Sequence, residues 1–275
     1  MTTSSSNDTQ ATIGALTSHR VLSFDGTDAA SFLQGYLTCD TDKLKSDTAL
    51  PGAFTNLKGR VVANGWVWGE ATQVQMLVVA SLTEAVANFL KPYMNFSKTK
   101  LSVADESPTA ILLNASKPVP NTIQIGSYGG LLTETSKQTL DLSPQWLERC
   151  IAVNEPVLSE ATSGTYLPQM LGLTKMGAVS FDKGCYLGQE IVARAEHRGE
   201  VKRRLQRISY AAQIKPVPGA KLTDESGRVR ATLICASTNA ALIVSSEDLS
   251  GTQQWFAEDT PVAVNIATAT LSAAR

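Results

Sequence analysis

Apolar residues along the first part of the chain recur with two periods, and each period predicts one kind of element. Alternating or unbroken apolar runs predict strands, whereas a spacing of three to four residues predicts helices. Strands are expected at residues 21–24, 61–68, 74–80, 111–113 and 122–125, with Gly129-Gly130 forming a hairpin turn before Leu131-Leu132. Helices are expected around residues 32–37, 82–90 and 143–151. The pattern predicts mixed α and β structure.

Short polar motifs predict where these helices begin. Residues 25–28 are expected to form a turn and a helix cap. Residues 81–84 read Ser-Leu-Thr-Glu, which has the spacing of a capping box. Ser143-Pro144 fits an N-cap followed by a proline in the first turn. Each helix should therefore start at a defined residue.

The C-terminal part of the chain has a different pattern. Val229, Ala231, Leu233 and Cys235 alternate with polar or small residues, and Val262, Val264 and Ile266 do the same. This alternation, with frequent Pro and Gly, predicts a small antiparallel β domain, either a barrel or a sandwich. We expect a loose polar tail over residues 1–12, a body over 13–202 with two subdomains divided near 100–110, and the β domain over 203–275.

Composition and charge exclude several classes of protein. The 275 residues are 43% hydrophobic and 18% charged, which is ordinary for a globular protein. Lys and Arg total 24 against 25 Asp and Glu, so a globally basic nucleic-acid binder is excluded. Neither a signal peptide nor a membrane-spanning apolar run is visible, and a cytoplasmic protein with reduced thiols is expected.

The cysteines and histidines limit what metal the chain could hold. The four cysteines, Cys39, Cys150, Cys185 and Cys235, are far apart, and none belongs to a Cys-x-x-Cys pair. Only two histidines occur, His19 and His197, so a multi-histidine site is impossible. No stable metal site is therefore expected from spacing.

One segment is dense in chemistry-bearing residues. It comprises Lys183, Gly184, Cys185, Tyr186, Leu187, Gly188, Gln189 and Glu190. Glycines allow tight turns, and a helix is expected to begin near Gly188. A thiol just before a helix, with Lys183 and Arg194 nearby in sequence, could be held as a reactive anion. The alternative is that Cys185 is a buried and inert packing residue.

Two further features follow the motif. His197 could form a dyad with Cys185, although an exposed surface histidine is the simpler interpretation. Basic side chains then outnumber Glu196 and Glu200 in a local cluster made of Arg194, Arg198, Lys202, Arg203, Arg204 and Arg207. The cluster could contact an anionic ligand, a phosphate or RNA, or could be a solvated connector between domains. Walker A and Gly-x-Gly-x-x-Gly patterns are absent.

The motif closely resembles the K-G-C-Y-x-G-Q-E signature of the YgfZ-type folate-binding proteins, which are relatives of the glycine cleavage T-protein, an aminomethyltransferase. Other segments extend the resemblance to about residues 20–205. They are Phe32-Leu33-Gln34-Gly35 with Thr38 and Asp40, Lys58-Gly59-Arg60 with Asn64, 91–98, Tyr166-Leu167-Pro168-Gln169, and Val192-Ala193-Arg194.

The resemblance implies an α+β fold, with a ring-like T-protein-type body and a C-terminal antiparallel β-barrel. It implies tetrahydrofolate, or a derivative, in a central channel beside the cysteine segment. It also implies an accessory role in assembling or repairing iron–sulfur proteins, including tRNA-modifying enzymes. Those client or assembly proteins are then the expected partners, and membranes and nucleic acids are not.

The same resemblance suggests roles for individual residues. Cys185 would be the working thiol, supported by Lys183 and Arg194, and would touch a cluster transiently at most. Lys58, Asn64 and Gln189 are the candidate folate contacts. If the protein catalyses a reaction, the resemblance implies a tetrahydrofolate-dependent one-carbon transfer.

One departure from the family concerns pterin binding. Family members carry a glutamate where this chain has Ala152, so either Glu155 or Glu160 substitutes, or pterin recognition is weaker.

Two other functions are considered. A true glycine-cleavage aminomethyltransferase is the first, although the cysteine motif is not a T-protein feature and the chain is short for one. Direct RNA binding through residues 194–207 is the second, and the net charge of −1 and the lack of an RNA-binding aromatic motif argue against it.

Overall fold

The computed structural model describes residues 11–113, 120–133, 138–199, 201–210, 217–246, 251–257 and 260–266. The predicted tail lies outside these ranges except for its last two residues, and Thr12 begins the first strand, β1 (Thr12–Ala15). None of the helices in the described ranges is long and apolar enough to span a membrane.

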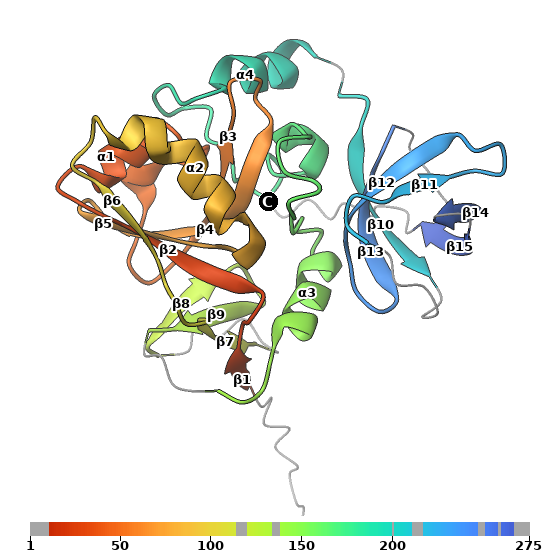
Figure 1. Ribbon diagram of the computed structural model, residues 1–275, viewed down its shortest axis with the longest axis horizontal. Coiled ribbons are helices and arrows are strands. Elements are labelled where there is room, and N and C mark those ends of the chain that lie inside the picture. The colour runs from red at the N-terminus through yellow and green to blue at the C-terminus, as the bar shows by residue number, and fades with distance from the viewer. Residues whose placement is uncertain are drawn as a thin grey trace, which may run out of the picture.

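A five-stranded antiparallel sheet forms the first layer of the body (Figure 1). Its strands, in spatial order, are β3 (Leu50–Thr55), β4 (Val61–Glu70), β5 (Gln73–Val79), β2 (His19–Asp25) and β6 (Lys100–Val103). Two helices cover one face, α1 (Ala29–Gln34) and α2 (Thr83–Met94). Short 3-10 turns precede β3 at Thr41–Lys43 and α2 at Ala80–Leu82. Apolar side chains of β4 and β5 are buried because both faces of this sheet are covered.

A four-stranded antiparallel sheet packs against the other face. Its order is β1, β7 (Thr109–Leu112), β9 (Gly129–Leu132) and β8 (Thr122–Ile125). Trp66 and Trp68 of β4 pack in one core with Ile123, Tyr128 and Trp146. Trp146 belongs to α3 (Ser143–Ala152), whose predicted stripe at Trp146, Cys150 and Ile151 is buried. The two sheets and α3 therefore share an aromatic core.

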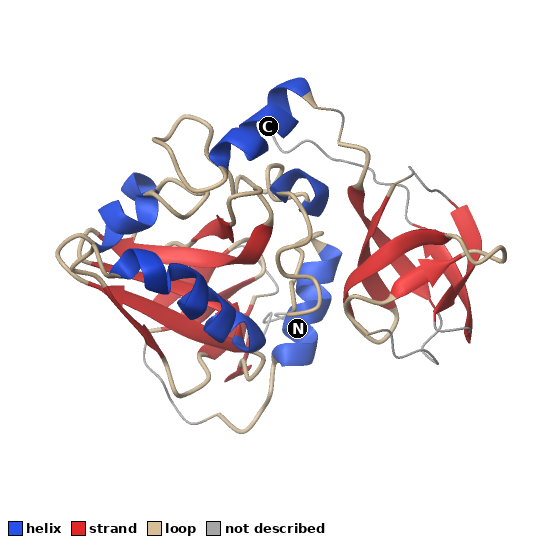
Figure 2. Ribbon diagram, turned by 45° about the horizontal axis from the view of Figure 1, so that its top comes forward, coloured by secondary structure: helices blue, strands red, loops and turns tan. Residues whose placement is uncertain are grey.

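The C-terminal strands close into an antiparallel barrel, which confirms the predicted fold class. The order around the barrel is β10 (Arg204–Tyr210), β13 (Ala240–Ser245), β12 (Val229–Ala236), β11 (Lys221–Thr223), β14 (Gly251–Ala257) and β15 (Thr260–Ile266). Its interior holds alternating side chains such as Ile208, Leu233, Ile243 and Trp255. In Figure 2, α3 stands between the sheets of the body and this barrel.

A long connection leads from α3 back across the body to the remaining helix. It includes a 3-10 turn at Pro168–Leu171 and ends in α4 (Gln189–Arg198). The backbone of Val61 hydrogen-bonds with this connection twice, to Tyr166 O at 2.8 Å and from Gly164 N at 2.7 Å. In Figure 1, α4 lies across the free end of the β3–β4 hairpin.

Three local predictions about turns and caps are wrong. Gly129 and Gly130 are the first two residues of β9 and not a turn. Glycine is needed at position 129 because a Cβ there would come within 2.8 Å of the Trp146 ring. The capping box is not formed: Leu82 is the N-cap of α2 and no side chain caps it. Ser143 is the first residue of α3, and the Asp141 carboxylate accepts its N–H at 2.9 Å.

The first helix is also shorter than its apolar spacing predicts. The pattern extended to Leu37, but α1 ends at Gln34. Leu37 instead forms an isolated antiparallel bridge with Phe54 of β3, and its side chain is fully buried. Packing against the sheet has therefore overridden the helical spacing.

Candidate functional site

The motif of residues 183–190 forms the turn that enters α4. Gly188 is the N-cap of α4 and has φ +85. A Cβ at this position would lie 2.3 Å from the backbone oxygen of Asn56 and 3.1 Å from the Cα of Gly59. Glycine is therefore required both for the left-handed backbone and for the close approach to the β3–β4 hairpin.

Backbone contacts fix the motif against three other segments of the body. Leu187 N donates to Gly35 O at 2.9 Å, and Thr55 Oγ1 donates to Leu187 O at 2.6 Å. Gln169 Nε2 donates to Val192 O at 2.9 Å. The motif and α4 thus pack against the segments around Gly35, Thr55 and Gln169, which are far apart in the sequence.

Cys185 differs from the other cysteines in its exposure. It is exposed, whereas Cys39, Cys150 and Cys235 are buried. Burial raises the pKa of Cys39 and of Cys235 to about 12 and that of Cys150 well above its usual value. The alternative that Cys185 is a buried packing residue is therefore wrong. Cys39, Cys150 and Cys235 are the buried cysteines.

Lys183 does not direct its charge toward the thiol. Its ammonium donates to Leu37 O and to Cys39 O, each at 2.8 Å, and the side chain is only 9% exposed. Burial lowers its pKa to about 8, and the surrounding acidic groups oppose this shift. The lysine thus ties the motif to the segment after α1. It also lies 5.3 Å from the centre of the Tyr186 ring.

The other predicted residues around the thiol lie on α4. Arg194 is exposed on this helix, and Glu190 is exposed in its first turn. Gln189 accepts a hydrogen bond from Tyr186 N at 3.1 Å, which closes the turn around the cysteine. His197 packs its ring edge-on against Phe181, with 5.6 Å between centroids, so it is a surface histidine with an aromatic contact.

The three candidate folate contacts are not brought into one cavity of the described residues. Lys58 is exposed at the tip of the β3–β4 hairpin, whose residues Asn56 and Gly59 pack against Gly188. Asn64 lies further along β4 and is buried, and its Nδ2 donates to Pro156 O at 2.7 Å. Among the described residues, nothing hydrogen-bonds to the buried Oδ1 of Asn64. That oxygen is an unsatisfied acceptor.

The sequence did not reveal that the Glu155 side chain is buried and hydrogen-bonded. Its carboxylate accepts from Trp66 Nε1 and from the Tyr128 hydroxyl, each at 2.7 Å. The side chain is buried, and this burial raises its pKa to about 7, although the two hydrogen bonds oppose the shift. Glu155 therefore belongs to the aromatic core between the sheets. Glu160, the other substitute considered for the missing glutamate, is exposed.

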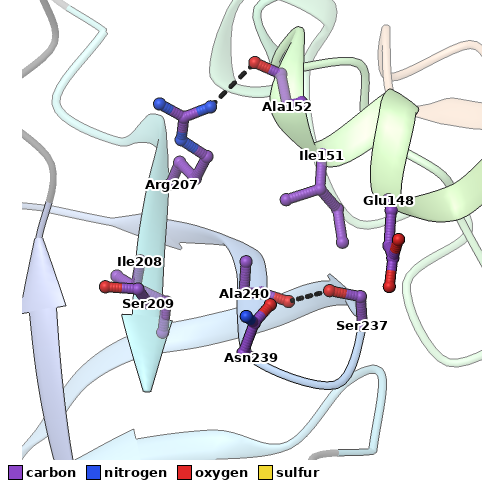
Figure 3. A pocket seen from close by; sticks show the side chains of 9 residues that line it. All are labelled: Glu148, Ile151, Ala152, Arg207, Ile208, Ser209, Ser237, Asn239 and Ala240. Carbon is purple, nitrogen blue, oxygen red and sulfur yellow. Dashed lines mark hydrogen bonds between the residues drawn. The ribbon is translucent and has the colours of Figure 1, made fainter. Parts of the chain in front are cut away.

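Ala152 faces a pocket of about 460 Å³ between α3 and the barrel (Figure 3). Arg207 of β10 spans its upper side and donates to Ala152 O at 2.8 Å. Glu148, one helical turn before Ala152, supplies the carboxylate of its lining. A neighbouring pocket of about 350 Å³ shares Glu148 and Ser237 and is otherwise mainly apolar. Sequence patterns missed both, since each combines elements from distant parts of the chain.

The described residues contain no cluster of three or more His, Cys, Asp or Glu side chains that could hold a metal ion.

Comparisons with known proteins agree with the fold. No family model matches the chain. The tRNA-modifying protein YgfZ of Escherichia fergusonii is 29% identical over 237 residues, which cover 74% of this chain and 73% of that protein. The chain is similar in sequence to YgfZ. The crystal structure of glycine cleavage system aminomethyltransferase T from Bartonella henselae matches with a TM-score of 0.68 over 93% of this chain and 84% of that one, at 12% identity. The protein therefore has the T-protein fold.

Proposed function

We propose that this protein is a folate-binding accessory protein of tRNA modification, and that it assists the iron–sulfur enzymes of that process in the cytoplasm. The observation that carries the proposal is the exposed thiol of Cys185 at the junction of four segments that match the YgfZ-type pattern. The name of the Escherichia fergusonii relative, a tRNA-modifying protein, supports the biological process.

Tetrahydrofolate or a derivative is the proposed ligand, and one feature of the chain fits it. The unsatisfied Oδ1 of Asn64 is a buried acceptor, and a pterin ring carries several N–H donors along its edge. Lys58 is a cation suited to the carboxylates of a folate tail. Gln189 would act through the turn that it closes around Cys185. When bound, the folate supplies a carrier for one-carbon units.

Cys185 is the proposed working thiol. The Lys183 side chain is anchored before it and the Leu187 backbone after it, while its own side chain is exposed, so a partner protein or its cluster can reach the sulfur without unfolding the site. Arg194, an exposed cation of the helix that follows, is proposed to support Cys185 in receiving that partner. Lys183 is a positioning residue, because its ammonium hydrogen-bonds to backbone carbonyls.

Aminomethyl transfer is not favoured by any feature of the site. The likeness to the aminomethyltransferase is 12% in sequence and therefore concerns the fold.

Titration of purified protein with tetrahydrofolate tests the ligand. We expect saturable binding, and we expect Asn64→Ala to weaken it about tenfold because the buried acceptor is lost. Ala152→Glu is the matched test of the family departure, since Ala152 is exposed and the variant should fold normally. If the pterin ring enters the pocket between α3 and the barrel, the carboxylate added at position 152 should tighten folate binding about tenfold. Absence of saturable binding by the unmodified protein would refute the folate proposal.

A further inference from the structure

Two exposed apolar side chains lie beside the motif turn. Leu57, at the tip of the β3–β4 hairpin, is 72% exposed, and Ile191, in the first turn of α4, is 41% exposed. Gly59 connects them: a Cβ at Gly59 would lie 3.1 Å from the Cβ of Ile191. Leu57 and Gly59 belong to the tight turn in which Gly59 N donates to Asn56 O, so Leu57 and Ile191 lie near each other where the hairpin meets the helix.

The exposed thiol lies close to this pair. Gly188 packs against the backbone of Asn56, the residue before Leu57. Cys185 precedes Gly188 by three residues, so their Cα atoms are at most about 11 Å apart. A molecule seated on the apolar pair would therefore be within reach of the sulfur.

Cations surround the apolar pair. Lys58 is exposed beside Leu57, and Arg194 and Arg198 follow Ile191 by three and seven residues, which places all three on one side of α4. Within the described part of the chain, none of these cations forms an ion pair. Exposed basic residues continue toward the barrel at positions 202–204.

Acidic side chains near this surface are fewer. Glu190 is exposed at its edge, and Glu196 is turned toward Gln169, whose Nε2 donates to it at 3.1 Å. Asp182 is exposed just before the motif. Together with the exposed basic residues at positions 202–204, Lys58, Arg194 and Arg198 outnumber these three acids, so the surface is positive in a chain whose net charge is −1. We call this the hairpin–helix surface, and it consists of Leu57, Lys58, Cys185, Ile191, Arg194 and Arg198.

We propose that the hairpin–helix surface docks an acidic segment of a partner protein, which inserts an apolar side chain between Leu57 and Ile191 and so comes within reach of Cys185. Charge complementarity argues for an acidic partner, and the aliphatic pair argues for a protein, because single-stranded RNA is commonly held by aromatic stacking. The inference rests on the proposed function in taking this partner as the protein that Cys185 serves.

Site-directed cross-linking in cells identifies the occupant. The photoreactive residue p-benzoylphenylalanine replaces Leu57 in the full chain, and a control protein carries it at Val229, which is 47% exposed on the barrel. We expect Leu57 to cross-link to an acidic segment of one partner protein, as identified by mass spectrometry of the joined peptides. Cross-links to RNA or to a second copy of this chain, or a yield no higher than at Val229, would overturn the proposal.

The cross-linked partner is then purified and titrated against variants. Leu57→Ser combined with Ile191→Ser should weaken binding about tenfold or more, as for other exposed apolar anchors. Arg194→Glu combined with Arg198→Glu should weaken binding about tenfold at low salt and less at high salt. Val217→Ser combined with Val229→Ser is the matched control, at two exposed barrel positions, and should change affinity less than twofold. Unchanged affinity of the Leu57/Ile191 variant would contradict the proposal.

A genetic test separates this inference from the proposed function. If Cys185→Ala restores tRNA modification in a bacterial strain lacking its YgfZ relative, the proposed function fails. If Cys185→Ala does not restore it but the Leu57/Ile191 variant restores it fully, the docking surface alone is refuted. Folate titration of the Leu57/Ile191 variant should match the unmodified protein, which checks that the variant is folded.

Discussion

The turn before α4 and the core between the two sheets place cysteines in opposite environments. In the core, Cys150 is buried beside Tyr128, with 3.5 Å between sulfur and hydroxyl, and its pKa is raised well above the usual value by burial. At the turn, Cys185 is exposed while its neighbours are held by backbone hydrogen bonds. The difference teaches that the fold fixes the main chain at the motif and leaves the side chain accessible.

Polar groups follow the same division. The core satisfies the carboxylate of Glu155 with two aromatic donors, so this acid contributes to packing between the sheets. The motif turn instead uses side chains to hold backbone groups, as Lys183 does for Leu37 and Cys39. One region thus buries its thiols and its acid, whereas the other leaves a thiol exposed.

Thiol labelling should give the largest difference between the two regions. Cys185 should react rapidly with a thiol reagent because its side chain is exposed. The three buried cysteines should react at least about a thousandfold more slowly, because they become accessible only on opening of the core. Mass spectrometry of native protein after brief labelling measures this. Rapid labelling of Cys150 would contradict the division.

Gly188→Ala should destabilise the protein strongly. The added Cβ would meet Asn56 O at 2.3 Å in a backbone with positive φ, and we expect a loss of about 3 kcal/mol or more. Gly184→Ala is the matched control, because nothing lies within 4 Å of a Cβ there, and it should change stability by less than about 0.5 kcal/mol. Denaturant unfolding measures both. Equal stabilities would mean that the turn is not fixed as described.

Glu155→Gln should change how stability depends on pH. The carboxyl pKa is about 7 in the fold and 4.5 when unperturbed, so the folded protein binds the extra proton between these values. Stability of the unmodified protein should therefore fall, relative to the variant, by about 3 kcal/mol as pH rises through this window. His19, whose pKa is lowered to about 4 by burial, acts in the opposite direction but is common to both proteins. Unfolding at pH 4.5 and pH 8 measures the difference, and parallel curves would contradict the burial of a neutral carboxyl.

Lys183→Met should have a smaller effect, on stability rather than on the thiol. Two backbone carbonyls lose a charged donor, which costs about 2 kcal/mol. Lys58→Met, at an exposed lysine, serves as control and should change stability by less than about 0.5 kcal/mol. The labelling rate of Cys185 should stay within about twofold in the Lys183 variant, since the ammonium points to the carbonyls. A large fall in that rate would instead show that Lys183 acts on the thiol.

Patterns of neighbouring residues predicted much of this structure. Alternation identified the central strands and a C-terminal antiparallel β domain, the family resemblance implied that this domain is a barrel, and the glycines of the motif indicated the turn before α4. Features set by distant contacts were not predictable. Trp146 packs on Gly129 of β9. Lys183 hydrogen-bonds to Leu37, 146 positions away, and Trp66 hydrogen-bonds to the buried Glu155, 89 positions away. Such long-range pairs leave no periodic signal in the sequence.

The site was predicted in part. The motif and the segments that pack around it were recognisable from the sequence, and so was the distinct status of one cysteine. The direction of the Lys183 ammonium and the pocket at Ala152 depend on how α3, the hairpin and the barrel meet. Local sequence does not encode those angles.

Complementation with cysteine variants tests the central claim most directly. In a strain lacking its YgfZ relative, the level of modified tRNA is measured after expression of Cys185→Ala or of Cys235→Ala, each at matched soluble abundance. We predict that the Cys235 variant restores the modification and that the Cys185 variant does not, although the Cys185 variant is as stable as the unmodified protein. Full restoration by Cys185→Ala would contradict the account.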